Sequence, residues 1–180
     1  MTASEHRRFL AGDPAAREAV VRRAGRITMP LAIAVLGDRE AASDITQDVA
    51  LAVLRGLHRL STPESFDAWV RRIAVRHSIR AARRRRFLVG VEYPLDEAET
   101  SVRETPGTDT VLLRATLREA LADLSARQRA AIGLRYIHGL SDAEIAAALG
   151  CRAGTASSLL TRARDLLRKS GLLAFEGGTP

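Results

Sequence analysis

Arginines at helical spacing are the residues whose chemistry is easiest to interpret. Between residues 64 and 86 they recur three or four positions apart: Arg72, Arg76, Arg80 and then Arg83 or Arg84. That spacing places the guanidinium groups on one face of a helix. Guanidinium groups bind phosphate oxygens in a fixed fork, so a stripe of them can follow a nucleic-acid backbone. A solvated helix face is the usual interpretation of a charge run, but a stripe along an amphipathic helix favours phosphate binding.

Residues 140–160 have the pattern of a helix-turn-helix. Ser141 and Glu144 have the spacing of a capping box, and Gly150 supplies the turn four residues after the small Ala146. The second helix would bury a stripe made of Ala156, Leu160, Ala163 and Leu167. Its other side would present polar groups to DNA base edges, namely Arg152, Thr155, Ser158 and Arg162. A plain helical hairpin is the alternative, but the caps and flanking arginines favour DNA binding.

Residues 39–57 form the one predicted helix with an acidic face. Glu40, Asp44, Gln47 and Asp48 would share one side of it, in a part of the chain that is otherwise strongly basic. Such a face is a poor DNA surface. It fits a solvated surface, a balance for neighbouring arginines, or a docking surface for a basic protein. The residues alone favour the solvated surface.

Charge divides the 180 residues into three parts. Residues 1–86 have 17 Arg against 9 acidic residues, residues 87–110 have one Arg against 6, and residues 111–180 have 10 basic against 6 acidic residues. The middle part contains Pro94, Pro106 and Gly107 and reads as a linker between two basic domains. We therefore expect an all-α protein with two small helical domains, 1–86 and 111–180, joined by a flexible acidic linker at 87–110. The expected helices are 14–25, 29–36, 39–57, 64–86, 110–123, 126–137, 142–148 and 154–169.

The sequence also excludes several classes of function. Cys151 is the only cysteine, so an intramolecular disulfide and a thiolate-rich zinc site are both excluded. No nucleophile–base pair, metal cage or phosphate-binding glycine loop is present, so we expect no enzyme, no metal and no cofactor. The longest apolar stretch, 27–37, contains Pro30 and is too short to span a bilayer. The start lacks a signal peptide, so we expect a cytoplasmic protein that is not inserted in a membrane.

The order of these features resembles the extracytoplasmic-function (ECF) group of the sigma-70 family of RNA polymerase sigma factors. The similar segments run from Leu36 to Asp48, from Phe66 to Ala74 and from Leu124 to Ala146. The resemblance implies that Asp44, Gln47 and Asp48 contact core RNA polymerase, which reverses the interpretation of that face as merely solvated. It also implies that residues 58–65 and the arginines of helix 64–86 (Arg72, Arg76, Arg80, Arg83 and Arg84) recognise and open the promoter −10 element.

The same resemblance implies that residues 111–180 bind the −35 element through Arg152, Thr155, Ser157, Ser158 and Arg162. Ser157, Leu159 and Thr161 stand where Lys, Arg and His are common in the family, so fewer phosphate contacts are expected there. The implied function is promoter-specific transcription initiation, with core polymerase and promoter DNA as partners. An anti-sigma factor that covers the polymerase-binding surface is a further hypothesis. The alternatives are a helix-turn-helix regulator that works without polymerase and a sigma-like decoy that does not direct initiation.

Overall fold

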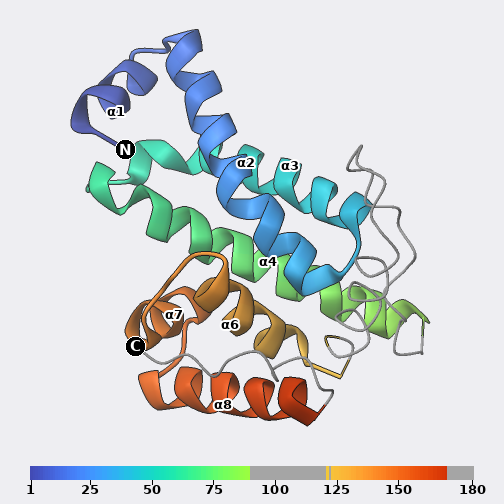
Figure 1. Cartoon of the computed structure of the whole chain (residues 1–180). Coiled ribbons are helices and arrows are strands. Elements are labelled where there is room, and N and C mark those ends of the chain that lie inside the picture. Colours follow the sequence, from blue (N-terminus) through green and yellow to red (C-terminus); the bar gives the residue numbers. More distant parts are fainter. Residues whose placement is uncertain (90–120, 122, 170–180) are drawn as a thin grey trace, which may run out of the picture.

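The chain is helical over the part that the structure describes. The computed structural model describes residues 1–89, 121 and 123–169, with side chains for all of these except 86–89. The predicted all-α fold class is confirmed (Figure 1). The helices whose bounds lie in this part are α1 (Ala3–Leu10), α2 (Pro14–Leu36), α3 (Arg39–Gly56), η1 (Leu57–Arg59), η2 (Pro63–Ser65), α4 (Phe66–Val89), α6 (Ala126–Tyr136), α7 (Asp142–Leu149) and α8 (Ala153–Lys169).

Helix α1 was not predicted, although the sequence contains its start signal. The hydroxyl of Thr2 accepts a hydrogen bond from the backbone N–H of Glu5, and the Glu5 carboxylate accepts one from the backbone N–H of Thr2 at 2.7 Å. This reciprocal pair is a capping box, which satisfies two N–H groups that the first turn leaves without partners. Phe9, near the end of the helix, is buried. The Thr-x-x-Glu spacing would therefore have identified α1.

Helix α2 corrects the prediction of two helices, 14–25 and 29–36. It continues through Pro30 without interruption from Pro14 to Leu36. A proline inside a helix removes one backbone hydrogen bond and crowds the preceding turn, at a cost of about 3 kcal/mol. Ile27 and Leu31, on either side of it, are both buried in the same core. Their burial stabilises the continuous helix against the proline, and the helix ends at Gly37, whose φ of 69° is left-handed.

The helices α6, α7 and α8 follow the predicted helix-turn-helix pattern. Ser125 and Ser141 each form a capping box, with Gln128 and Glu144 respectively. Gly150 ends α7 with a φ of 63°, a conformation that glycine adopts without steric cost. The predicted stripe of α8 is buried, with Ala156, Leu160, Ala163 and Leu167 all at most 6% exposed. The fold of this segment is confirmed.

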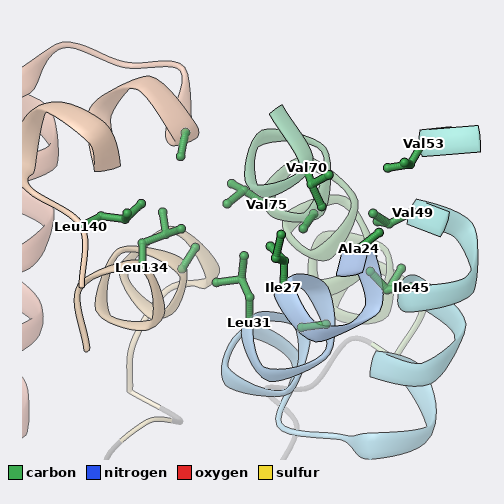
Figure 2. Close-up of a cluster of buried hydrophobic side chains, with 14 of the residues drawn as sticks. Ala24, Ile27, Leu31, Ile45, Val49, Val53, Val70, Val75, Leu134 and Leu140 are labelled. Atoms are coloured by element: carbon green, nitrogen blue, oxygen red, sulfur yellow. The ribbon is translucent and has the colours of Figure 1, made fainter. Parts of the chain in front are cut away.

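Helices α1–α4, which we call the first region, and helices α6–α8, which we call the second region, pack against each other. Most of their buried residues form one continuous cluster, and Leu124, Ala163 and Leu167 form a second, smaller one. Leu31 of α2 and Leu134 of α6 are completely buried, and Figure 2 shows Leu134 and Leu140 pointing toward Ile27, Leu31 and Val75. Helix α6 comes close to α2 at Gly133, where an added Cβ would lie 3.1 Å from Leu31 Cδ1. The glycine thus permits the approach of the two regions.

The predicted domain limits remain predictions. Helix α4 continues to Val89, three residues past its predicted end. Residues 90–110 of the predicted linker lie outside the described residues. So does the predicted helix 110–123, apart from residues 121 and 123.

Candidate nucleic-acid and protein interfaces

Helix α4 presents its arginines to solvent, as the spacing predicts. Its inward face is fixed by Phe66, Val70 and Ala74, each fully buried. Five arginines on the remaining surface are exposed: Arg72, Arg76, Arg80, Arg83 and Arg84. These five also line one groove, which has a volume of about 940 Å³. The structure therefore brings together all five arginines that the resemblance assigns to the −10 element, whereas residues 58–65 do not line this groove.

Two ion pairs hold α4 in its place. Arg23 of α2 donates two hydrogen bonds to the Asp67 carboxylate, at 2.7 and 2.9 Å, and its guanidinium also lies over the Phe66 ring. The Arg23 guanidinium holds the pKa of Asp67 below its ordinary value, although partial burial opposes this shift. Nearer the other end of α4, Arg85 pairs with Asp38, the capping residue of α3, at 2.6 Å. The arginine surface therefore has a defined position relative to α2 and α3.

The second region forms the opposite wall of the arginine groove. Arg127 of α6 contributes a sixth guanidinium, and Ala148, Leu149 and Gly150 at the end of α7 complete that wall. Arg72 Nε lies 3.3 Å from the carbonyl oxygen of Ala147 in α7. Arg127 was not predicted to belong to this surface, because it lies in the first turn of a helix from the other region. Only the packing of α6 on α4 places it in the groove.

Helix α3 carries the acidic face, and none of its residues lines this groove. Ala42, Ile45, Val49 and Val53 are buried, so the helix can expose only its other side. Asp44, Gln47 and Asp48 lie on that side and are all exposed. Neither carboxylate forms an ion pair with another residue in the described part of the chain. The face is a negative surface in a region of excess positive charge, which suits a basic protein better than DNA.

Helix α8 presents a polar surface on the side of α6 and α7 that faces away from α4 (Figure 1). The five residues that were predicted to contact the −35 element are all exposed: Arg152, Thr155, Ser157, Ser158 and Arg162. The Ser158 hydroxyl donates to the Gly154 carbonyl oxygen at 2.9 Å. The hydroxyl oxygen of Ser158 can still accept a hydrogen bond from a ligand. The buried stripe fixes the rotation of the helix, so the exposed set is determined by packing.

Two histidines are partly buried and have lowered pKa values. For His77 on α4, burial is the largest cause of the lowered pKa, and the nearby Asp48 carboxylate opposes this lowering. His138 lies at the junction of the two regions, where burial and the nearby Arg71 lower its pKa. The backbone of Ile27 has an opposing, raising effect on this pKa, and the buried Nε2 of His138 has no hydrogen-bond partner among the described residues. Neither histidine belongs to a metal-type cluster in the part of the chain that the structure describes.

The fold and these surfaces define a class of protein. It is a helical protein with a helix-turn-helix, a second basic surface suited to phosphates, and a separate acidic face suited to a protein partner. No helix in the described ranges is both long and apolar enough to cross a membrane.

Family models identify the class more closely. Residues 17–87 match the model of sigma-70 region 2, and residues 114–167 match that of sigma-70 region 4. The chain is 32% identical over 142 residues to the ECF RNA polymerase sigma factor SigC of Mycobacterium tuberculosis, covering 75% of this chain and 72% of the relative. It therefore belongs to the sigma-70 family, in the ECF group. Promoter-directed transcription initiation is the function of this family.

Other relatives and solved structures agree with this assignment. The chain is 33% identical over 139 residues to SigL of M. tuberculosis, covering 76% of this chain and 78% of the relative. It is 32% identical over 164 residues to SigE of Mycolicibacterium smegmatis, covering 87% of this chain but only 63% of that longer relative. In fold it is similar to the sigma factor RpoE of Bartonella quintana, which was solved with the anti-sigma factor NepR. The TM-score is 0.66 at 24% identity, and the match covers 87% of this chain and 94% of RpoE. CnrH, solved with the cytosolic domain of CnrY, has the same TM-score at 23% identity, covering 92% and 94%.

Proposed function

We infer that this chain binds core RNA polymerase through the acidic face of α3 and directs it to promoters through the arginines of α4 and the exposed face of α8. The observation that carries this inference is the exposed, unneutralised pair Asp44 and Asp48 in a region with 17 Arg against 9 acidic residues. An acidic surface there repels DNA and attracts a basic protein surface. Membership of the sigma-70 family supports core RNA polymerase as that protein.

The two DNA surfaces have different roles in this proposal. The arginines of α4 bind the backbone of the −10 element and, with residues 58–65, hold it open. Arg152, Thr155, Ser157, Ser158 and Arg162 on the second region contact −35 duplex. Because only two of these five residues are cations, their contribution to salt-dependent binding is small beside that of the five α4 arginines. The chain has no catalytic activity of its own, and it works in the bacterial cytoplasm, where its polymerase is.

Charge reversal on α3 tests the polymerase-binding surface. Asp44→Arg with Asp48→Arg is expected to abolish the capture of core polymerase, because two attractive contacts become repulsive. Both residues are exposed, so the fold should be unaffected. Glu18→Arg with Asp123→Arg is the matched control, since it makes the same change in net charge at two exposed carboxylates outside α3, α4 and α8. Equal polymerase capture by both double variants would show that the acidic face of α3 does not bind polymerase.

An anti-sigma protein is the second proposed partner. RpoE and CnrH, whose folds this chain shares, were both solved with a partner protein, and in the case of RpoE that partner is named an anti-sigma factor. We expect such a protein to cover the acidic face of α3. Affinity purification of the chain from its native cell should therefore recover two kinds of complex, one with polymerase and one with a small inhibitor. Recovery of polymerase alone under non-inducing conditions would contradict this.

A further inference from the structure

We propose that the arginine groove between α4 and α6–α7 is a docking site for the chain's own acidic segment, residues 92–99, in the free protein. The groove is lined by six arginines, and no acidic residue of the described part lines it. None of the six forms an ion pair with a described carboxylate. Guanidinium groups gathered around one groove repel each other and concentrate anions there. The groove therefore favours an anionic occupant.

The composition of residues 92–99 matches the lining of the groove. The groove has arginines along its sides, and it also exposes apolar surface from Val75, Ile79, Ala148 and Leu149. Residues 91–99 read Val-Glu-Tyr-Pro-Leu-Asp-Glu-Ala-Glu, so four carboxylates are interleaved with apolar side chains and no basic residue. The carboxylates can pair with the arginines while the apolar groups contact the groove's apolar surface. A phosphate backbone would satisfy the arginines only.

The length of the chain also fits. Glu92 follows the last residue of α4, Val89, by three positions, and Arg84 lies five residues before Val89 on the same helix. A rise of 1.5 Å per residue separates Arg84 from Val89 by about 7.5 Å, and three extended residues span about 10 Å. The twelve residues from Arg72 to Arg84 cover about 18 Å of helix, and the seven steps from Glu92 to Glu99 reach about 23 Å when extended. The segment can therefore turn back from α4 and reach every arginine.

A segment of the same chain has an advantage over any acidic partner in solution. A short tether gives an effective concentration on the order of millimolar, so weak individual ion pairs are enough to fill the groove. Bound there, residues 92–99 would neutralise charge on both walls and hold the two regions together. Promoter DNA would then have to displace the segment from Arg72, Arg76, Arg80, Arg83 and Arg84. That last consequence rests on the proposed function of these arginines, whereas the docking itself does not.

Residue-specific chemical modification of arginine tests the docking without polymerase or DNA. The test variant is Glu92→Gln, Asp96→Asn, Glu97→Gln and Glu99→Gln. The matched control changes four carboxylates outside 92–99, as Glu104→Gln, Asp109→Asn, Glu119→Gln and Glu176→Gln. All eight positions lie outside the described helices, so the fold of those helices should be unaffected. Reaction with phenylglyoxal at Arg80 and Arg84 is measured by mass spectrometry, with the exposed Arg55 and Arg59 as internal references.

If the segment fills the groove about 80% of the time, Arg80 and Arg84 should react about fivefold faster in the test variant than in wild type. The control variant and the reference arginines should react as in wild type. Equal rates at Arg80 and Arg84 in all three proteins would overturn the proposal. Protection that disappears on dilution would overturn it as well, because it would assign the groove to a second copy of the chain. A chain that fails to bind polymerase can still show the protection, so this test is separate from that of the proposed function.

Discussion

Enlarging Gly133 should separate the two regions. An added Cβ at this buried position would lie 3.1 Å from Leu31 Cδ1 and 3.4 Å from Ala34 Cβ. Alanine gains about 1 kcal/mol of helix propensity over glycine, but crowding in a packed core costs about 1–3 kcal/mol. Leu31 is completely buried and has no room to move away. Gly133→Ala should therefore be close to neutral, and Gly133→Leu should lower the free energy of unfolding by at least about 2 kcal/mol.

Urea unfolding followed by circular dichroism measures this difference, and Gly25→Ala provides the control. An added Cβ at Gly25, inside α2, meets only Thr46 Cγ2, at an ordinary 3.7 Å. That variant should gain about 0.5–1 kcal/mol from helix propensity alone. Small-angle scattering of Gly133→Leu should also show a larger radius of gyration than wild type. If Gly133→Leu is as stable and as compact as wild type, α6 does not pack on α2 and the continuous core is refuted.

Three further predictions concern charge, pH and capping. The first variant replaces four α4 arginines with alanine (Arg76, Arg80, Arg83 and Arg84). For single-stranded DNA, the slope of log affinity against log salt concentration, measured by fluorescence anisotropy, should decrease in magnitude by about 3. An unchanged slope would show that these arginines do not contact DNA. The lowered pKa of His138 means that the unfolded chain binds its proton more readily, so stability should be full above the ordinary value of 6.5 and should fall as the pH drops below it. His138→Gln should flatten this loss below about pH 6.5, leaving the part due to His77. Ser141→Ala removes the cap of α7 and should cost about 1 kcal/mol in urea unfolding, and no change would show that the capping box is not needed.

Local signals predicted most of the helices correctly. The capping boxes at Ser125 and Ser141 and the apolar stripe of α8 depend on neighbours along the chain, so they are visible in the sequence. The same signal at Thr2 marks α1 and was overlooked. The break expected at residues 26–28, just before Pro30, was wrong, and α2 continues through the proline despite its local cost. Burial of Ile27 and Leu31 in the core is a tertiary effect, and it outweighs that cost.

The candidate surfaces were predictable as sets of residues but not as shapes. Helical periodicity places five arginines of α4 on one face, and the structure shows these five exposed there (Arg72, Arg76, Arg80, Arg83 and Arg84). Nothing in the sequence indicates that Arg127 faces them across a groove, because that depends on how α6 packs on α2 and α4. The pairing of Arg85 with Asp38, which fixes α4 against the start of α3, depends on packing in the same way.

Transcription in a purified system tests the central claim most directly. Core RNA polymerase with the wild-type chain, supplied with a genomic fragment library, should give transcripts with defined starts that core alone does not produce. The charge-reversal variant Asp44→Arg with Asp48→Arg should give none, while Glu18→Arg with Asp123→Arg should give the wild-type pattern. If wild type binds core but no defined transcript appears on any fragment, the chain is a decoy and not an initiation factor, and the account is contradicted.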